Sequence, residues 1–289
     1  MKKVLSLFLA LISVFVIISN VFAYDPEPST QAVTQQSNDE ITAAQNKQID
    51  ANKIIAAEKS YSEGLISKTT LNSVIASFNQ KYNKNLSAIG MNSQISPMGV
   101  GSDTYAVIGI PCNAQQQTWY CGPASAYNII SGIGITKNPH DGRSLTQTNL
   151  ANDLGAQTVG APFAGSWAAT MASWTNYFYV ASWASSSGTI TQWTSDIDTD
   201  IRVDVHDTSN TTGVVCDTHQ TPSDTINRLV GYDSVTSDVW HYVAADGFDE
   251  TNKIFHYADC NVYRSGAFGT HWVSQSIMAH VTWDRGIVW

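Results

Sequence analysis

Residues 115–131 read QQQTWYCGPASAYNIIS, and the recognisable chemistry of the chain gathers around the cysteine at their centre, Cys121. Pro123 suits the first turn of a helix, because the N–H that proline lacks would have no partner there. The residues after it are compatible with a helix until Gly132 and Gly134 end it. The stretch therefore predicts a helix that starts at Cys121. Backbone N–H groups and the helix dipole favour an anion at such a point, so the thiol is expected to ionise more easily than a free cysteine.

A β-hairpin is predicted in the C-terminal part of the chain. Residues 240–245 and 254–259 have the character of strands, and the connection between them, 247–253, contains the turn-forming sequence DETN. A turn centred near Glu250 pairs residues whose numbers sum to about 500, which places His241 opposite Asp259. An imidazole is thus expected beside a carboxylate.

These residues form a set of nucleophile, base and orienter. Cys121 would attack a carbonyl carbon, His241 would take the thiol proton and later protonate the leaving amine, and Asp259 would hold the imidazole in one tautomer. Gln115 is the preferred donor of a side-chain N–H to the oxyanion, together with the backbone N–H of Cys121. The two glutamines that follow Gln115 leave this choice open. Trp119 and Tyr120 are expected to line the site.

The motifs around these residues resemble a known family. QxxxxYCGPAS before a helix, then HYVAADGFD and YAD, is similar to the papain-like cysteine peptidases, in particular the branch related to bacteriocin-leader-processing (double-glycine) peptidases. The resemblance runs from about Ile108 to the C-terminus. It implies an α+β, papain-like two-part fold, with a helical half that carries the cysteine and an antiparallel sheet half that carries the histidine and the aspartate. It also implies that Cys121, His241, Asp259 and Gln115 are the catalytic residues. Nothing in the chain resembles the transporter to which bacteriocin-processing members are fused, so their double-glycine specificity is not expected here.

The part of the chain before this domain divides into two segments. Residues 1–23 carry two lysines, an apolar run and the small-residue ending VFA, which is typical of a secretory signal peptide, the alternative being an uncleaved membrane anchor. Residues 24–104 predict a small helical pro-region, with helices starting near a capping box at Ser37 and Glu40 and near Thr69, followed by a linker. A plain spacer is the alternative to a pro-region. The peptidase domain is predicted at 105–289.

The net charge of the C-terminal part limits the classes of partner that are expected. From residue 101 onward, seven Lys or Arg residues face seventeen Asp or Glu residues, a formal charge of −10. A nucleic-acid partner is not expected, because phosphate binding needs a basic surface. No membrane partner is expected once the signal peptide is removed, and no cofactor is expected. The expected partner is a peptide or protein substrate, and the oligomeric state cannot be read from the sequence.

The remaining cysteines, a group of possible metal ligands and a run of aspartates have structural interpretations. If Cys121 is free, the other cysteines allow one disulfide, for which Cys216 and Cys260 are preferred over Cys112 because both lie in strand-like segments. His256, Asp259 and Cys260 are disfavoured as metal ligands, because neighbouring strand residues point to opposite faces. Four aspartates are expected on a solvated face rather than in a calcium site: Asp196, Asp198, Asp200 and Asp204.

The sequence therefore predicts a secreted cysteine peptidase that works through a thioacyl-enzyme on Cys121. Acyl transfer of the transglutaminase or peptide-ligase type is an alternative, because it uses the same residues with an amine as acceptor. A non-enzymatic secreted binding module on the same scaffold is a second alternative. The presence of all three residues of the triad argues against that module.

Overall fold

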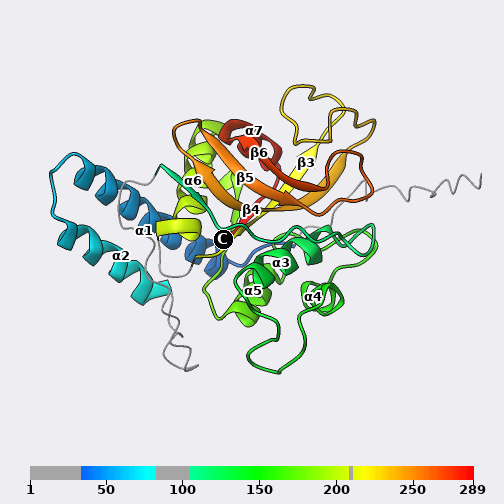
Figure 1. The fold of residues 1–289 in the computed structure, drawn as a ribbon, viewed down its shortest axis with the longest axis horizontal. Helices are drawn as coiled ribbons and strands as arrows, with labels where there is room; N and C mark the ends of the chain where they lie inside the picture. Colours follow the sequence, from blue (N-terminus) through cyan, green and yellow to red (C-terminus); the bar gives the residue numbers. More distant parts are fainter. Residues whose placement is uncertain (1–33, 83–103, 208–210) are drawn as a thin grey trace, which may run out of the picture.

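A computed structural model describes residues 34–82, 104–207 and 211–289 (Figure 1). The predicted signal peptide and the linker before residue 104 lie outside these residues. The helices are α1 (Asn38–Ser62), α2 (Lys68–Tyr82), α3 (Cys121–Gly132), α4 (Gln147–Leu154), α5 (Trp167–Thr175), α6 (Ile190–Arg202) and α7 (Gln275–Val281), with a 3-10 turn, η1 (Ala184–Ser187), and a π-helical turn, η2 (Val203–Asp207). The strands are β1 (Tyr105–Val107), β2 (Ala181–Trp183), β3 (Val214–Gln220), β4 (Val239–Asp249), β5 (Ile254–Asp259), β6 (Gly269–Ser274) and β7 (Gly286–Val288).

The strands form one antiparallel sheet in the order β2-β7-β3-β4-β5-β6, with β1 paired to the far end of β4. Side chains alternate between its two faces, as the period of a strand requires. On β3, for example, Val215 packs in one apolar cluster with residues of α3, α4 and α5, whereas Val214 and Cys216 pack in a second cluster with residues of α6 and α7. The helix that begins at Cys121 and the sheet that carries His241 thus form two packed layers (Figure 1). This arrangement is α+β and is compatible with the expected papain-like fold.

The two N-terminal helices start at or near the capping residues that the sequence predicts. At α1 the Ser37 hydroxyl accepts from Glu40 N, and the Glu40 carboxylate accepts from Ser37 N, which confirms the capping box. At α2 the cap is Ser67, whose hydroxyl accepts from Thr70 N, so the predicted start near Thr69 was two residues late. Among the described residues, no helix has both the length and the apolar character needed to cross a membrane.

Helix α1 packs against α6, β2 and η2. Lys47 is buried there, and its ammonium donates to Asp204 Oδ1 at 3.4 Å and to Phe178 O at 3.3 Å. Arg202 of α6 donates to Glu58 of α1 at 2.9 Å. The N-terminal helices are therefore joined to the sheet domain by buried and half-buried ion pairs.

This packing overturns the prediction of a solvated acidic face. Asp196 and Asp200 of α6 and Asp204 of η2 are buried, because α1 packs against both elements. Burial raises the pKa of Asp200 well above its ordinary value, and it raises the pKa of Asp204 as well. Asp198 is buried in part, and burial together with a hydrogen bond to Glu250 raises its pKa to about 8. Residues some 150 positions apart create this environment, so the local pattern of charges could not reveal it.

Helix α5 turns one apolar face toward the core. Trp167, Met171 and Trp174 of α5 are fully buried, as expected of core residues. Phe178 is 41% exposed, because α5 ends at Thr175 and Asn176 adopts a left-handed conformation that turns the chain.

Candidate active site

Cys121 is the first residue of α3, as the sequence predicted, and Pro123 lies in the first turn. The start of this helix is pressed against the sheet layer. A Cβ at Gly122 would lie 3.0 Å from Trp167 and 3.1 Å from Tyr242 of β4, so a larger residue there would push these side chains aside. The Ser125 hydroxyl also donates to the carbonyl of Tyr242 at 3.0 Å. These contacts hold the helix start against the strand that carries His241.

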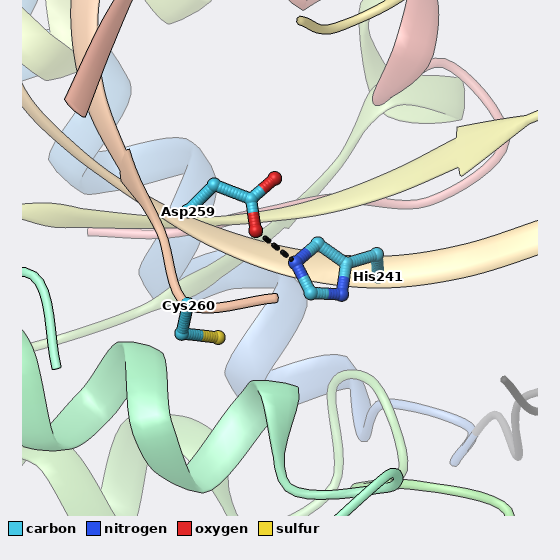
Figure 2. Close-up of side chains that lie close together, drawn as sticks. All are labelled: His241, Asp259 and Cys260. Atoms are coloured by element: carbon cyan, nitrogen blue, oxygen red, sulfur yellow. Dashed lines mark hydrogen bonds and ion pairs between the residues drawn. The ribbon is translucent and has the colours of Figure 1, made fainter. Parts of the chain in front are cut away.

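His241 and Asp259 are in direct contact (Figure 2), with His241 Nε2 2.8 Å from Asp259 Oδ1. The predicted register was slightly wrong, because Ala244 pairs with Ala258 and the pair numbers sum to 502. Asp259 therefore lies opposite residue 243, and His241 is its diagonal neighbour rather than its direct partner. Diagonal neighbours in a sheet stay within reach of long side chains, so the contact forms nonetheless.

The imidazole of His241 is oriented by this contact. Its Nε2 faces the carboxylate, which leaves Nδ1 as the nitrogen available to act on the Cys121 thiol. Burial by itself would lower the pKa of His241. The electrostatic effects of Tyr232 and Asp259, with the hydrogen bonds to Asp259 and Cys121, outweigh burial and raise this pKa well above its ordinary value. A proton on His241 is thus stabilised, as a thiolate–imidazolium pair requires.

Asp259 has further partners that sequence reasoning missed. Asn261 N donates to Asp259 Oδ1 at 2.9 Å, and the Tyr232 hydroxyl donates to Asp259 Oδ2 at 3.2 Å. Asn261 follows β5 directly, so its proximity could have been inferred from the strand end. Tyr232 comes from the connection between β3 and β4, and no motif in the sequence indicated it.

Gln115 lies buried beside the site, whereas Gln116 and Gln117 are exposed. Its backbone N–H donates to Cys260 O at 2.9 Å, which ties the loop before α3 to the end of β5. Its Nε2 donates to Gln117 O at 3.0 Å and to Thr118 O at 2.9 Å. Position therefore favours Gln115 among the three glutamines, but its amide hydrogens are directed at loop carbonyls. Its role toward an oxyanion stays a prediction.

Two aromatic residues directly precede Cys121. Trp119 and Tyr120 are half-buried, and their rings meet edge to face with centroids 6.0 Å apart. Their partial exposure next to the thiol agrees with the expectation that they line the site.

All four cysteines are free, which contradicts the preferred disulfide. Cys216 and Cys260 belong to the two different apolar clusters of the sheet domain, so their side chains do not meet. Burial raises the pKa of both thiols to about 12. Cys260 lies next to the site, with Sγ 3.6 Å from Cys121 O, and the Cys112 thiol donates to Asp259 O at 3.1 Å.

One group of possible metal ligands occurs in the described part of the chain, and it overlaps the site. Ligand atoms of His241, Asp259 and Cys260 lie within 4.8 Å of one another. The strand alternation used to separate Asp259 from Cys260 does not apply, because β5 ends at Asp259. His256 is not part of this group, because its Nδ1 lies 2.5 Å from Asp246 Oδ1. A metal thiolate is disfavoured, since the Cys260 thiol is held protonated and both Asp259 oxygens already accept hydrogen bonds.

The sequence matches the model of one protein family. The model of the Peptidase_C39 like family matches residues 107–278, a range that contains Gln115, Cys121, His241 and Asp259. No curated protein matches the chain. The match spans more than half of the chain and covers the helix start, the hairpin and the sheet described above. The protein therefore belongs to the Peptidase_C39 like family, and it is a papain-like cysteine peptidase of the bacteriocin-processing type.

Proposed function

We propose that this protein is a secreted cysteine peptidase that hydrolyses peptide bonds through a thioacyl-enzyme on Cys121. The observation that carries the proposal is the contact between His241 and Asp259, which lies beside the start of α3 that carries Cys121. Nucleophile, base and orienter lie in the order that the chemistry requires. The family relationship implies a peptide or protein substrate.

The proposed first step forms the acyl-enzyme. His241 Nδ1 takes the thiol proton of Cys121, and the thiolate attacks the carbonyl carbon of the scissile bond. The backbone N–H at the helix start and, we propose, the Gln115 amide stabilise the oxyanion. For this, Gln115 would exchange one of its loop carbonyls for the oxyanion. When the intermediate collapses, the C–N bond breaks, the protonated His241 gives its proton to the leaving amine, and a thioester remains.

The second step releases the acyl group. His241 takes a proton from water, the hydroxide oxygen attacks the thioester carbonyl, and the C–S bond breaks to regenerate the thiol. Asp259 accepts the Nε2–H throughout, which keeps Nδ1 available for both proton transfers and stabilises the imidazolium.

A labelling experiment tests the nucleophile. Iodoacetamide should label native Cys121 rapidly, with slower labelling in His241→Ala and none at this site in Cys121→Ala. Cys112 is a built-in control, because it is more exposed than Cys121 but has a pKa raised by burial. If peptide mapping finds equal labelling of Cys121 with and without His241, the proposed activation is refuted.

Peptide cleavage tests the reaction itself. The native chain and Cys121→Ala are incubated with a peptide library, with and without a primary amine. Cleavage products that depend on Cys121 and lack the amine support hydrolysis. Amine adducts in place of hydrolysis products would show acyl transfer, and products formed equally by Cys121→Ala would refute a peptidase that uses this thiol.

The proposed processing concerns the N-terminal part. We propose removal of residues 1–23 on secretion and a pro-region role for residues 24–104, of which α1 packs on the peptidase domain and α2 packs on α1. Mass spectrometry of the secreted native chain and of Cys121→Ala tests this. A later cut near residue 104 supports the pro-region, whereas a stable N-terminus at Tyr24 in both would remove it. Retention of residues 1–23 would refute signal cleavage.

A further inference from the structure

The carboxylate of Asp259 is held by more groups than the imidazole it orients. Oδ1 accepts from His241 Nε2 at 2.8 Å and from Asn261 N at 2.9 Å, and Oδ2 accepts from the Tyr232 hydroxyl at 3.2 Å. All four residues are buried. A buried carboxylate with donors on both oxygens is held in one orientation.

The direction of each hydrogen bond in this network can be assigned. Tyr263 N donates to Asn261 Oδ1 at 3.0 Å, so the oxygen end of this amide is identified by its donor. The other end, Asn261 Nδ2, lies 3.1 Å from the Tyr232 hydroxyl oxygen. An amide NH₂ can only donate, so the hydroxyl accepts there and directs its one hydrogen at Asp259.

Tyr232 is brought to this position by backbone packing. It belongs to the connection between β3 and β4, whereas Asn261 belongs to the connection that follows β5. The two connections touch at Gly231, where a Cβ would collide with the backbone of Ala267. Gly231 also has a φ of +86°, which favours glycine. The network therefore links two loops with Asp259.

We propose that Tyr232, oriented by Asn261, is a positioning residue for the Asp259–His241 pair. It acts by holding the carboxylate through Oδ2, so that Oδ1 faces His241 Nε2. This proposal deepens the proposed function of the same site and rests on it.

The test compares Tyr232→Phe with Tyr257→Phe. The Tyr257 hydroxyl accepts from Val230 N at 3.1 Å, so the control removes a hydroxyl of β5 that bonds to the same β3–β4 connection but is not hydrogen-bonded to Asp259. The alkylation rate of Cys121 by iodoacetamide is measured across pH. Tyr232→Phe should react roughly tenfold more slowly than the native chain, as expected for one lost hydrogen bond to a charged group. The acidic limb of its profile should move to higher pH, because Tyr232 and Asp259 raise the pKa of His241 against the effect of burial, and a less firmly held carboxylate stabilises the imidazolium less.

Two outcomes would overturn the proposal. One is a native rate and acidic limb in Tyr232→Phe, and the other is the same change in Tyr257→Phe, which would indicate a general effect on the loops. If Tyr232→Phe fails to fold by circular dichroism, Asn261→Ala is used, because it leaves the Tyr232 ring in place and removes the donor that orients its hydroxyl. Asn261→Ala should slow the alkylation of Cys121, and an unchanged rate refutes the proposal.

The alkylation rate of Cys121 tests the positioning role of Tyr232 separately from the proposed peptidase activity. Alkylation of Cys121 needs no peptide substrate. Slower alkylation of Tyr232→Phe in a protein that cleaves no peptide would leave the positioning role in place and refute the peptidase. If the native chain cleaves peptides and Tyr232→Phe is alkylated at the native rate, the peptidase is supported and the positioning role of Tyr232 is refuted.

Discussion

Replacement of Lys47 by methionine tests the packing that joins the N-terminal helices to the peptidase domain. Lys47 is buried, and its ammonium lies 3.4 Å from Asp204 Oδ1 and 4.1 Å from the ring centroid of Trp289. Asp200 is near enough to act on it electrostatically. Methionine keeps most of the volume of the lysine stem but removes the positive charge from a buried set of carboxylates.

The expected cost follows from these contacts. Removal of one partner from a buried ion pair typically costs about 3–5 kcal/mol, because the remaining charge is left uncompensated. We expect Lys47→Met to lower the free energy of unfolding by about this amount at pH 8. Lys53→Met is the matched control, because Lys53 lies on the same helix and its side chain is 62% exposed in a surface pair with Asp50. A surface pair contributes little, so the control should unfold close to the native chain.

The pH dependence gives a sharper test. The pKa values of Asp200 and Asp204 are raised in the folded chain, mainly by burial. Between the unfolded and the folded pKa, the folded chain binds more protons, so stability falls as pH rises. Loss of Lys47 raises both pKa values further, and each unit corresponds to about 1.4 kcal/mol. The deficit of Lys47→Met should therefore shrink when the pH is lowered from 8 to 5.

Urea unfolding at a series of pH values, followed by circular dichroism and tryptophan fluorescence, measures these quantities. If Lys47→Met loses no more unfolding free energy than Lys53→Met, the contribution of the buried ion pair is refuted. A deficit that does not shrink on acidification would refute the role assigned to the two carboxylates.

Three further changes test the site and its support. Asp259→Asn should slow Cys121 alkylation by roughly a hundredfold or more, because the amide no longer favours the tautomer with Nε2 protonated, and a native rate would contradict the orienter role. Gln115→Ala should reduce peptide cleavage by roughly a hundredfold, as expected for one lost oxyanion donor, whereas the exposed neighbour Gln116→Ala should not, and equal losses would contradict the assignment. Gly122→Ala should lower the unfolding free energy by about 1–3 kcal/mol, because its Cβ would lie 3.0 Å from Trp167, and an unchanged thermal midpoint would show that the helix start can shift freely.

Predictions from local patterns succeeded where neighbours in the sequence supply the physical cause. The helix start at Cys121, the capping box of α1, and the strand β5 were predicted with little or no error in their bounds. The hairpin prediction brought His241 to Asp259 despite a register error of two, because a short connection restricts how two strands can pair. Predictions were less successful where residues from distant parts of the chain surround the side chain in question.

The sequence by itself determined the chemistry and its local framework: a cysteine at a helix start, a histidine and an aspartate on one hairpin, and the family to which they point. Helix caps, turns and strand alternation act over a few residues, so they can be read from a single chain. Only the tertiary structure decided that the aspartates of α6 are buried under α1, that Cys216 and Cys260 lie in different clusters, and that Tyr232 reaches Asp259. Each of these depends on packing between segments far apart in the sequence, because burial and hydrogen bonding are set by whichever residues the fold brings together.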